Sequence, residues 1–433
     1  MKGKSINPHI CAMTIFIVMA LSWLPGGAKP RMAGDIYDVE AAMADSLTVS
    51  LITCYPGPEV YELYGHEAIR VRGEGRDSVW NYGVFDFRAP NFIYRFVKGE
   101  TDYMCVGYPF AWFLPEYEKR GSKVVEQDLN LTQKEAHALL ASLQKSALPE
   151  NRTYRYNYVK DNCATRILDR IDSVSESPIV YPHTVAFGSF RNEMREYNRD
   201  YPWYQLGIDI ALGAGIDYPI TSRDEMFVPV EMMTRVDGAM MLDGRPLVRE
   251  SRTIFEGVPD ATLGPGTPWL RPLPVSCALA VLTLCLCFLN FRNGKITRWV
   301  YFLWFALLGV AGCLVWFLVF ISVHEATSPN TLLLWLSPMQ LITAVAMVLK
   351  RLKTVGVIMA WYNIVAVVST LLVWPFQHQS ANPSFFPLMG ITLMLAVTYA
   401  IIAPKISYNN MRIRKNASGS SRSKSIRIRQ TKK

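Results

Sequence analysis

The sequence lacks the short motifs that mark the commonest metal, nucleotide and hydrolase sites. It contains no His-Glu-x-x-His, no Cys-x-x-Cys, no glycine-rich phosphate loop and no Gly-x-Ser-x-Gly. Zinc-dependent, nucleotide-dependent and serine-hydrolase chemistry therefore finds no support in the sequence, and we expect no metal and no organic cofactor. Histidine is also scarce, with 6 in 433 residues, so each histidine can be considered separately as a candidate catalytic residue.

Charged residues are missing from the interior of five hydrophobic blocks that follow residue 273. Each block approaches the ~20 apolar residues that a helix needs to span a bilayer. Proton pumps and ion-coupled transporters build their pathways from intramembrane charges, so this absence argues against both. We predict an all-α transmembrane bundle of five helices. The blocks are residues 274–291, 299–322, 331–349, 355–375 and 385–402.

Basic residues in the connections predict the orientation of this bundle. Lysine and arginine occur in the first and third loops and in the tail, but not in the second and fourth loops. Positive charge marks the cytoplasmic side, so the chain before Pro268 is expected outside and the C-terminus inside. From Lys405 the tail carries ten basic and no acidic residues, and without it the net charge of +9 becomes −1. We expect this tail to contact anionic lipid rather than nucleic acid.

The N-terminus has the pattern of an export signal. Two lysines precede an apolar run over residues 10–24, and the small residues Gly26 and Ala28 follow. This pattern predicts a signal peptide or an uncleaved anchor, and either sends the next domain across the membrane. The expected divisions are 1–29 for the signal, 30–268 for an exported domain with an extension, 269–403 for the transmembrane domain and 404–433 for the basic tail.

The exported domain contains three cysteines, Cys54, Cys105 and Cys163. Three thiols cannot all pair, so at least one is free, either as an inert buried side chain or as a nucleophile. Asn162 is a good N-cap before apolar residues at helical spacing, which places Cys163 in the first turn of a helix. The helix dipole there favours a thiolate and a lowered pKa. Cys54, which follows a strand, is the alternative nucleophile or a disulfide partner of Cys105.

Residues 47–84 predict an antiparallel sheet of three strands, because apolar residues alternate and turn residues separate the runs. The second strand begins at His66, which a hairpin centred near Gly75 places across from the neighbourhood of Asn81 to Val84. His66 is therefore the candidate base for the Cys163 thiol. Asn81 is our candidate for the third catalytic residue, and Asp86 is the runner-up.

A cysteine at a helix N-terminus against a histidine on a sheet is the arrangement of papain-type enzymes. Here the histidine comes first in the chain, so we predict an α+β papain-like domain in circularly permuted order. Residues 176–268 are less informative. Three carboxylates in them, Asp224, Glu225 and Glu231, show no pairing pattern and are expected to be solvated, and residues 264–268 are typical of a linker.

Several of these segments, taken together and in this order, resemble the N-terminal periplasmic domain of the Lnb family. That family comprises lipoprotein N-acyltransferases of Gram-negative anaerobes with a membrane bundle behind the domain. The resemblance covers most of residues 46–235, whereas the C-terminal helices are similar in layout only. Leu168 stands where a basic residue is expected. The segments are Leu51-Ile-Thr-Cys-Tyr-Pro-Gly57, Tyr64-Gly-His-Glu-Ala-Ile-Arg-Val71, Asn81-Tyr-Gly-Val-Phe-Asp-Phe87 with Ala89-Pro-Asn-Phe92, Asp161-Asn-Cys-Ala-Thr-Arg166, Tyr204-Gln-Leu-Gly-Ile-Asp-Ile-Ala-Leu-Gly213 and Met226-Phe-Val-Pro229.

The resemblance implies a multi-pass enzyme of the inner membrane with Cys163 as nucleophile and His66 as its base. It implies that an acyl chain moves from a phospholipid to a Cys163 thioester and then to the α-amine of a diacylated lipoprotein. The phospholipid, the lipoprotein and the membrane are the implied partners, and no cofactor is needed. Two alternatives stay open: a membrane-anchored Cys/His peptidoglycan hydrolase, and a non-catalytic envelope scaffold in which both side chains only pack.

Overall fold

The structure is a computed structural model, and it describes residues 46–405 except 58, 60, 61, 87, 183–187 and 259–267. The predicted signal segment, nearly all of the basic tail and most of the predicted linker lie outside the described residues. The chain forms two compact units. The first contains the described residues up to Gln205, Ile216–Pro268 and Ser322–Glu325, and the second contains Leu206–Gly215, Trp269–Ile321 and the described residues from Ala326 onward.

The first unit is built on a seven-stranded antiparallel sheet in the order β6-β4-β3-β2-β1-β5-β9. Its strands are β1 Thr48–Cys54, β2 His66–Gly73, β3 Arg76–Val84, β4 Asp102–Pro109, β5 Val124–Leu129, β6 Thr153–Arg155 and β9 Val248–Phe255. The predicted three-stranded arrangement is confirmed and lies at the centre of this larger sheet. The β2–β3 hairpin turns at Glu74 and Gly75, which both have positive φ angles, as a two-residue hairpin turn requires.

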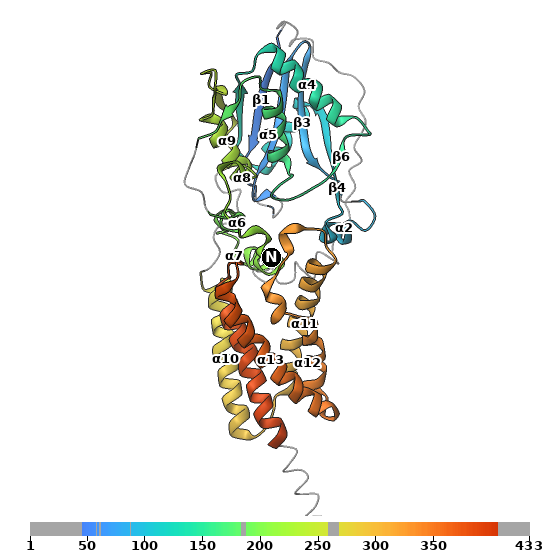
Figure 1. Ribbon diagram of the computed structural model, residues 1–433, viewed down its shortest axis with the longest axis vertical. Helices are drawn as coiled ribbons and strands as arrows, with labels where there is room; N and C mark the ends of the chain where they lie inside the picture. The colour runs from blue at the N-terminus through green and yellow to red at the C-terminus, as the bar shows by residue number, and fades with distance from the viewer. Residues whose placement is uncertain are drawn as a thin grey trace, which may run out of the picture. The chain divides into compact units, whose positions relative to one another are not determined.

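Helices cover both faces of the sheet, because alternate strand residues point to opposite sides. Ile69 and Val71 pack with helices α4 (Gln133–Ala147), α5 (Cys163–Val174) and α9 (Pro229–Asp237) in one core. Ala68 packs with α3 (Phe110–Arg120) in a second core. Figure 1 shows α4 and α5 lying along the strands. A capping box of Thr132 and Glu135 begins α4.

The rest of the first unit contains short elements that the sequence did not predict. They are α2 Phe92–Lys98, β7 Ile179–Val180, α6 Phe190–Tyr197, α8 Ser222–Glu225 and β8 Met240–Met241. Three more elements belong to both units in part: α7 Pro202–Ala211, η4 Ala214–Ile216 and η5 Pro268–Leu270.

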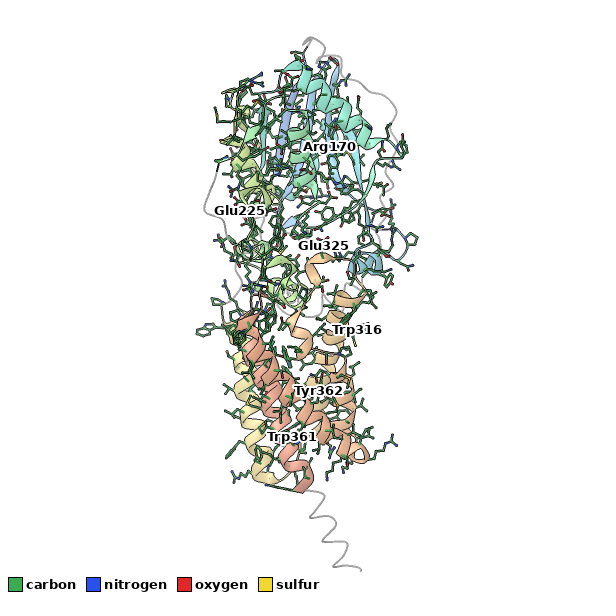
Figure 2. All side chains as sticks on the ribbon, viewed as in Figure 1. Arg170, Glu225, Trp316, Glu325, Trp361 and Tyr362 are labelled. Carbon is green, nitrogen blue, oxygen red and sulfur yellow. The ribbon has the colours of Figure 1, made fainter. Side chains whose placement is uncertain are left out.

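The expectation that Asp224, Glu225 and Glu231 are solvated is wrong for Glu225. This residue, labelled in Figure 2, is fully buried and forms an ion pair with Arg235, which is itself buried. Asp224 closes a capping box, and Glu231 accepts a hydrogen bond from Tyr197 at 2.9 Å. Buried charges are tolerated only when paired, and the partner of Glu225 lies on the neighbouring helix α9.

The second unit contains five helices that are long and apolar enough to cross a membrane, which confirms the predicted bundle. The first two are α10 (Pro272–Asn293) and α11 (Arg298–Phe320). The later three run over Thr331–Val348, Lys350–Phe376 and Phe385–Lys405. Their component elements, with the preceding turn η6 Glu325–Thr327, are η7 Thr331–Leu334, α12 Met339–Val348, η8 Lys350–Leu352, α13 Lys353–Val373 and η9 Trp374–Phe376.

The third span is interrupted between η7 and α12 at Trp335–Pro338. The side-chain amide of Gln340 donates to the Trp335 carbonyl at 2.7 Å. This hydrogen bond gives a partner to a backbone carbonyl at the break in the helix. Glycines of α11 pack directly on this interruption. A β-carbon added at Gly312 would lie 2.4 Å from the carbonyl carbon of Ser337. Close approach of the two spans therefore requires glycine at position 312.

We predict that Gly312→Ala destabilises the protein by about 1–3 kcal/mol, since the added methyl group must push two backbones apart. Gly390→Ala is the matched control, because no atom lies within 4 Å of its added β-carbon. Thermal unfolding of the two variants in detergent, followed by circular dichroism, should lower the midpoint for Gly312→Ala alone. Equal midpoints would contradict this packing.

Candidate active site

The end of the sheet where β1 stops and β2 starts holds most of the predicted site residues. Cys54 and His66 are directly paired across these two strands. Gly65 precedes His66 with a φ of 77°, and a β-carbon there would lie 2.4 Å from the Cys54 carbonyl oxygen. Only glycine fits this turn without strain. The backbone conformation therefore explains the glycine of the Gly-His pair, and the chemistry of the imidazole explains the histidine.

The structure brings His66 and Asn81 together. The Nε2 atom of His66 lies 2.7 Å from the Oδ1 atom of Asn81, and the Asn81 amide donates to the hydroxyl of Tyr108. An amide oxygen only accepts, so Nε2 carries the hydrogen and Nδ1 of the neutral ring is left as the basic atom. Tyr108, on β4, was not predicted from the sequence, because its role depends on the register of β3 against β4.

Burial sets the charge of His66. It lowers the pKa of the imidazole below its usual value, the hydrogen bond to Asn81 partly opposes this, and Arg120 lowers the pKa further. The ring also stacks on Tyr117 of α3, with centroids 6.3 Å apart. His66 is therefore neutral at pH 7 and able to accept a proton.

The start of α5 is fixed by its N-cap. The side chain of Asn162 accepts from the Thr165 backbone N–H at 3.0 Å, and the Thr165 hydroxyl accepts from the Asn162 N–H at 2.8 Å. The Asn162 amide also donates to the Phe227 carbonyl at 2.8 Å. Cys163 is thus the first residue of α5, as the N-cap pattern predicted, and its sulfur lies beside N–H groups of the first turn, which have no partner within the helix.

The sulfur of Cys163 lies close to the start of β2. Backbone hydrogen bonds from Glu67, the residue after His66, and from Ala164 lower the pKa of the thiol, but burial outweighs them and raises it. The expected lowering of this pKa is therefore wrong, because the dipole argument ignored desolvation. On β3, Gly83 packs against the same residue, since an added β-carbon would lie 3.8 Å from that of Cys163.

The remaining candidates lie in different settings. Cys54 is fully buried, and burial raises the pKa of its thiol well above the usual range. Its proposed disulfide with Cys105 does not form: both are free, and they belong to the two different cores of the domain. Asp86 is exposed and bonds Arg88, so the structure does not join it to His66.

Glu67 and Leu168 complete the surroundings. Glu67 is fully buried, accepts from the Thr53 hydroxyl at 2.9 Å, and has a pKa raised well above its usual value by burial. Leu168, which stands where the family resemblance leads one to expect a basic residue, is buried in the core. It therefore cannot contact a lipid headgroup. Among the residues that the structure describes, no three His, Cys, Asp or Glu side chains cluster as metal ligands.

Comparisons with known proteins identify two matching family models. The model described as the Lnb N-terminal periplasmic domain matches residues 37–186, and the model described as the Lnb transmembrane domain matches residues 265–406. Together they cover more than half of the chain. Neither the curated proteins nor the solved structures provide a match.

We predict that Cys163 reacts slowly with iodoacetamide at pH 7, since its thiol is buried, with 8% of the residue exposed, and its pKa is raised. The labelling rate should increase with pH through the usual thiol pKa of about 8.5 without reaching a plateau. Peptide mass spectrometry of the labelled protein measures this rate, with the buried Cys54 and Cys105 as internal controls that stay unlabelled. A plateau near pH 7 would instead reveal a resting thiolate and refute the neutral pair.

Proposed function

The chain belongs to the Lnb family, and on this premise we propose that it is a lipoprotein N-acyltransferase of the inner membrane. The proposal assigns Cys163 as nucleophile, His66 as general base and Asn81 as the residue that orients the imidazole. The observation that carries it is that consecutive residues of β2 contact the two groups: His66 bonds Asn81 at 2.7 Å, and the backbone of Glu67 bonds the Cys163 sulfur.

In the first step His66 takes the thiol proton of Cys163, and the sulfur attacks the ester carbonyl carbon of a phospholipid. The C–O bond breaks, the proton passes to the departing lysophospholipid alcohol, and a thioester remains on Cys163. In this proposal backbone N–H groups at the start of α5 stabilise the tetrahedral oxyanion. Because the resting pair is neutral, the thiolate forms only during attack.

In the second step the free α-amine of an S-diacylglyceryl-cysteine attacks the thioester. His66 accepts a proton from the amine, the C–S bond breaks, and the proton returns to the sulfur of Cys163. The product is an amide-linked acyl chain on the lipoprotein. Both substrates are insoluble in water, which gives the five membrane helices a purpose that peptidoglycan cleavage would not.

The proposal also includes the finer features expected from the sequence. They are the circularly permuted papain-like order, the domain divisions at residues 29, 268 and 403, a catalytic domain in the periplasm and a cytoplasmic C-terminus. The order of His66 on β2 before Cys163 on α5 supports the permutation. The lysines and arginines in the first and third loops and in the tail support a cytoplasmic C-terminus.

Lipoprotein N-termini provide the direct test of this function. In cells lacking the gene, wild-type protein and Cys54→Ala should restore the amide-linked acyl chain, whereas Cys163→Ser should not, because a serine hydroxyl is a far weaker nucleophile without further activation. Mass spectrometry of lipoprotein N-terminal peptides measures the chain. Altered muropeptides with normal lipoproteins would favour the hydrolase, and no change in either would favour the scaffold.

The pH dependence tests the role of Asn81. Transfer should fall as pH drops through the His66 pKa, below about 6.5, because the protonated ring cannot act as base. The Asn81 hydrogen bond raises this pKa, so Asn81→Ala should move the acidic limb to lower pH. It should also slow transfer by about tenfold to a hundredfold, part of the ~10²–10⁴ that a positioned base contributes.

Asp86→Asn is the matched control for this measurement, since Asp86 is exposed and pairs with Arg88. It should leave both the rate and the acidic limb unchanged. A limb that moves to higher pH in Asn81→Ala, or a loss of activity in Asp86→Asn, would remove Asn81 from the assignment.

A further inference from the structure

A cavity of about 510 Å³ lies in the first unit beside α5. No carboxylate lines it, whereas four basic residues do: Lys145, Arg152, Arg166 and Arg170. Such a one-sided lining is unusual for a domain surface in which acidic and basic residues otherwise intermix. The remaining lining residues are Tyr82, Cys105, Ala141, Ser142, Ser146, Asn151 and Tyr154.

Three of the four cations are not neutralised by the protein. Arg166 pairs with Asp161 at 2.5 Å. No described carboxylate lies within 4.0 Å of Lys145, Arg152 or Arg170, and the partners of Arg170, labelled in Figure 2, are uncharged: it donates to the Ser142 hydroxyl at 3.4 Å and interacts with the Tyr82 hydroxyl. Like charges that share a cavity without a counterion repel one another, so this cavity favours an anion.

Two buried hydroxyl groups in the cavity wall add to this argument. Tyr82 is 1% exposed and Tyr154 is 8% exposed, and neither hydroxyl makes a hydrogen bond of good geometry among the described residues, although Ser146 and Arg170 lie near the first and the Gly83 backbone near the second. Buried polar atoms are nearly always well paired, so each hydroxyl can still take a better acceptor. A phenol hydroxyl donates one hydrogen bond, which an anionic oxygen accepts well.

The cavity is connected to the candidate nucleophile through α5 and Tyr154. Arg166 and Arg170 follow Cys163 by three and seven residues, so they lie about one and two turns further along the helix, within ~10 Å. The Arg166 guanidinium lies 3.6 Å from the Tyr154 ring centroid, and the same tyrosine interacts electrostatically with Cys163. An anion in the cavity would therefore be held from the helix that begins with the nucleophile.

We propose that this cavity binds the phosphodiester of the acyl donor, a glycerophospholipid whose ester is presented to Cys163. Guanidinium groups fit phosphate oxygens in bidentate geometry, and the two tyrosine hydroxyls supply further donors. A glycerophospholipid carries its esters and its phosphate on one glycerol, so one helix can hold both. This assignment rests on the proposed function, from which it takes the identity of the donor.

Binding is tested with full-length protein in detergent by isothermal titration calorimetry. Glycerophosphoethanolamine should bind the wild type, and Arg152→Gln/Arg170→Gln should weaken binding at least tenfold while its melting midpoint stays unchanged. Arg155→Gln is the matched control: Arg155 belongs to the same strand as Tyr154, is exposed, pairs with Asp102 and does not line the cavity. Tyr82→Phe, which removes only the hydroxyl, should weaken binding by a smaller factor.

Inorganic phosphate and glycerol are the comparison probes. Weaker binding of phosphate than of glycerophosphoethanolamine supports a lipid headgroup, whereas equal or tighter binding of phosphate identifies a free-phosphate site and overturns the lipid assignment. Binding of glycerol as tight as that of glycerophosphoethanolamine, or equal affinities of the wild type and the double variant, overturns the anion site altogether.

The acyl-transfer assay separates failure of this assignment from failure of the proposed function. With phosphatidylethanolamine vesicles, Arg152→Gln/Arg170→Gln should raise KM about tenfold and leave kcat nearly unchanged, and diacylglycerol should serve wild type and variant equally poorly. If neither the wild type nor the variant transfers acyl chains but the calorimetric results are as expected, the proposed acyltransferase function is refuted and the anion site remains. If kcat falls while KM is constant, the cavity is not a donor site.

Discussion

Burial of the reactive side chains is the constraint on which the candidate site depends. Desolvation lowers the pKa of His66 and raises that of Cys163, and it outweighs the hydrogen bonds that act in the opposite sense. Both groups are therefore neutral at rest. A neutral thiol at position 163 leaves no thiolate to be oxidised at rest, and in the proposed reaction the charges that form during attack would develop where little water competes with the backbone donors.

The sheet register explains why these groups lie together although they are far apart in the chain. The β2–β3 hairpin pairs Ala68 with Asn81, which brings the Asn81 amide two residues from His66 on the same face of the sheet. Glu67 alternates to the opposite face, toward α5, and its backbone hydrogen bond connects that face to Cys163. Two glycines with positive φ, Gly65 and Gly83, allow the backbone turns at this end of the sheet.

Local patterns in the sequence predicted the features that local physics determines. The N-cap at Asn162, the hairpin at Glu74 and Gly75, and the five apolar helices each follow from residues close together in the chain. What the sequence missed depends on distant partners: the ion pair of Glu225 with Arg235, the acceptor Tyr108, and the separation of Cys54 from Cys105 onto opposite faces. The pKa of Cys163 belongs to this second class, since desolvation comes from the packed domain. The catalytic roles of His66, Cys163 and Asn81 stay predictions.

The polar side chains of the second unit indicate what the membrane helices contribute to the protein. Thr392 accepts hydrogen bonds from the indoles of Trp304 and Trp335 at 3.1 and 3.2 Å, and the Asn363 amide donates to Thr343 at 3.2 Å. These groups are uncharged and bonded to one another, which is how membrane helices hold together rather than how they move ions. No Asp, Glu or His lies in the interior of the five spans, so in the proposed reaction the proton steps fall to the first unit, which contains His66 and Cys163. Under the same proposal the membrane helices would serve to admit the substrates, because a lipid and a lipid-anchored protein are both confined to the bilayer surface.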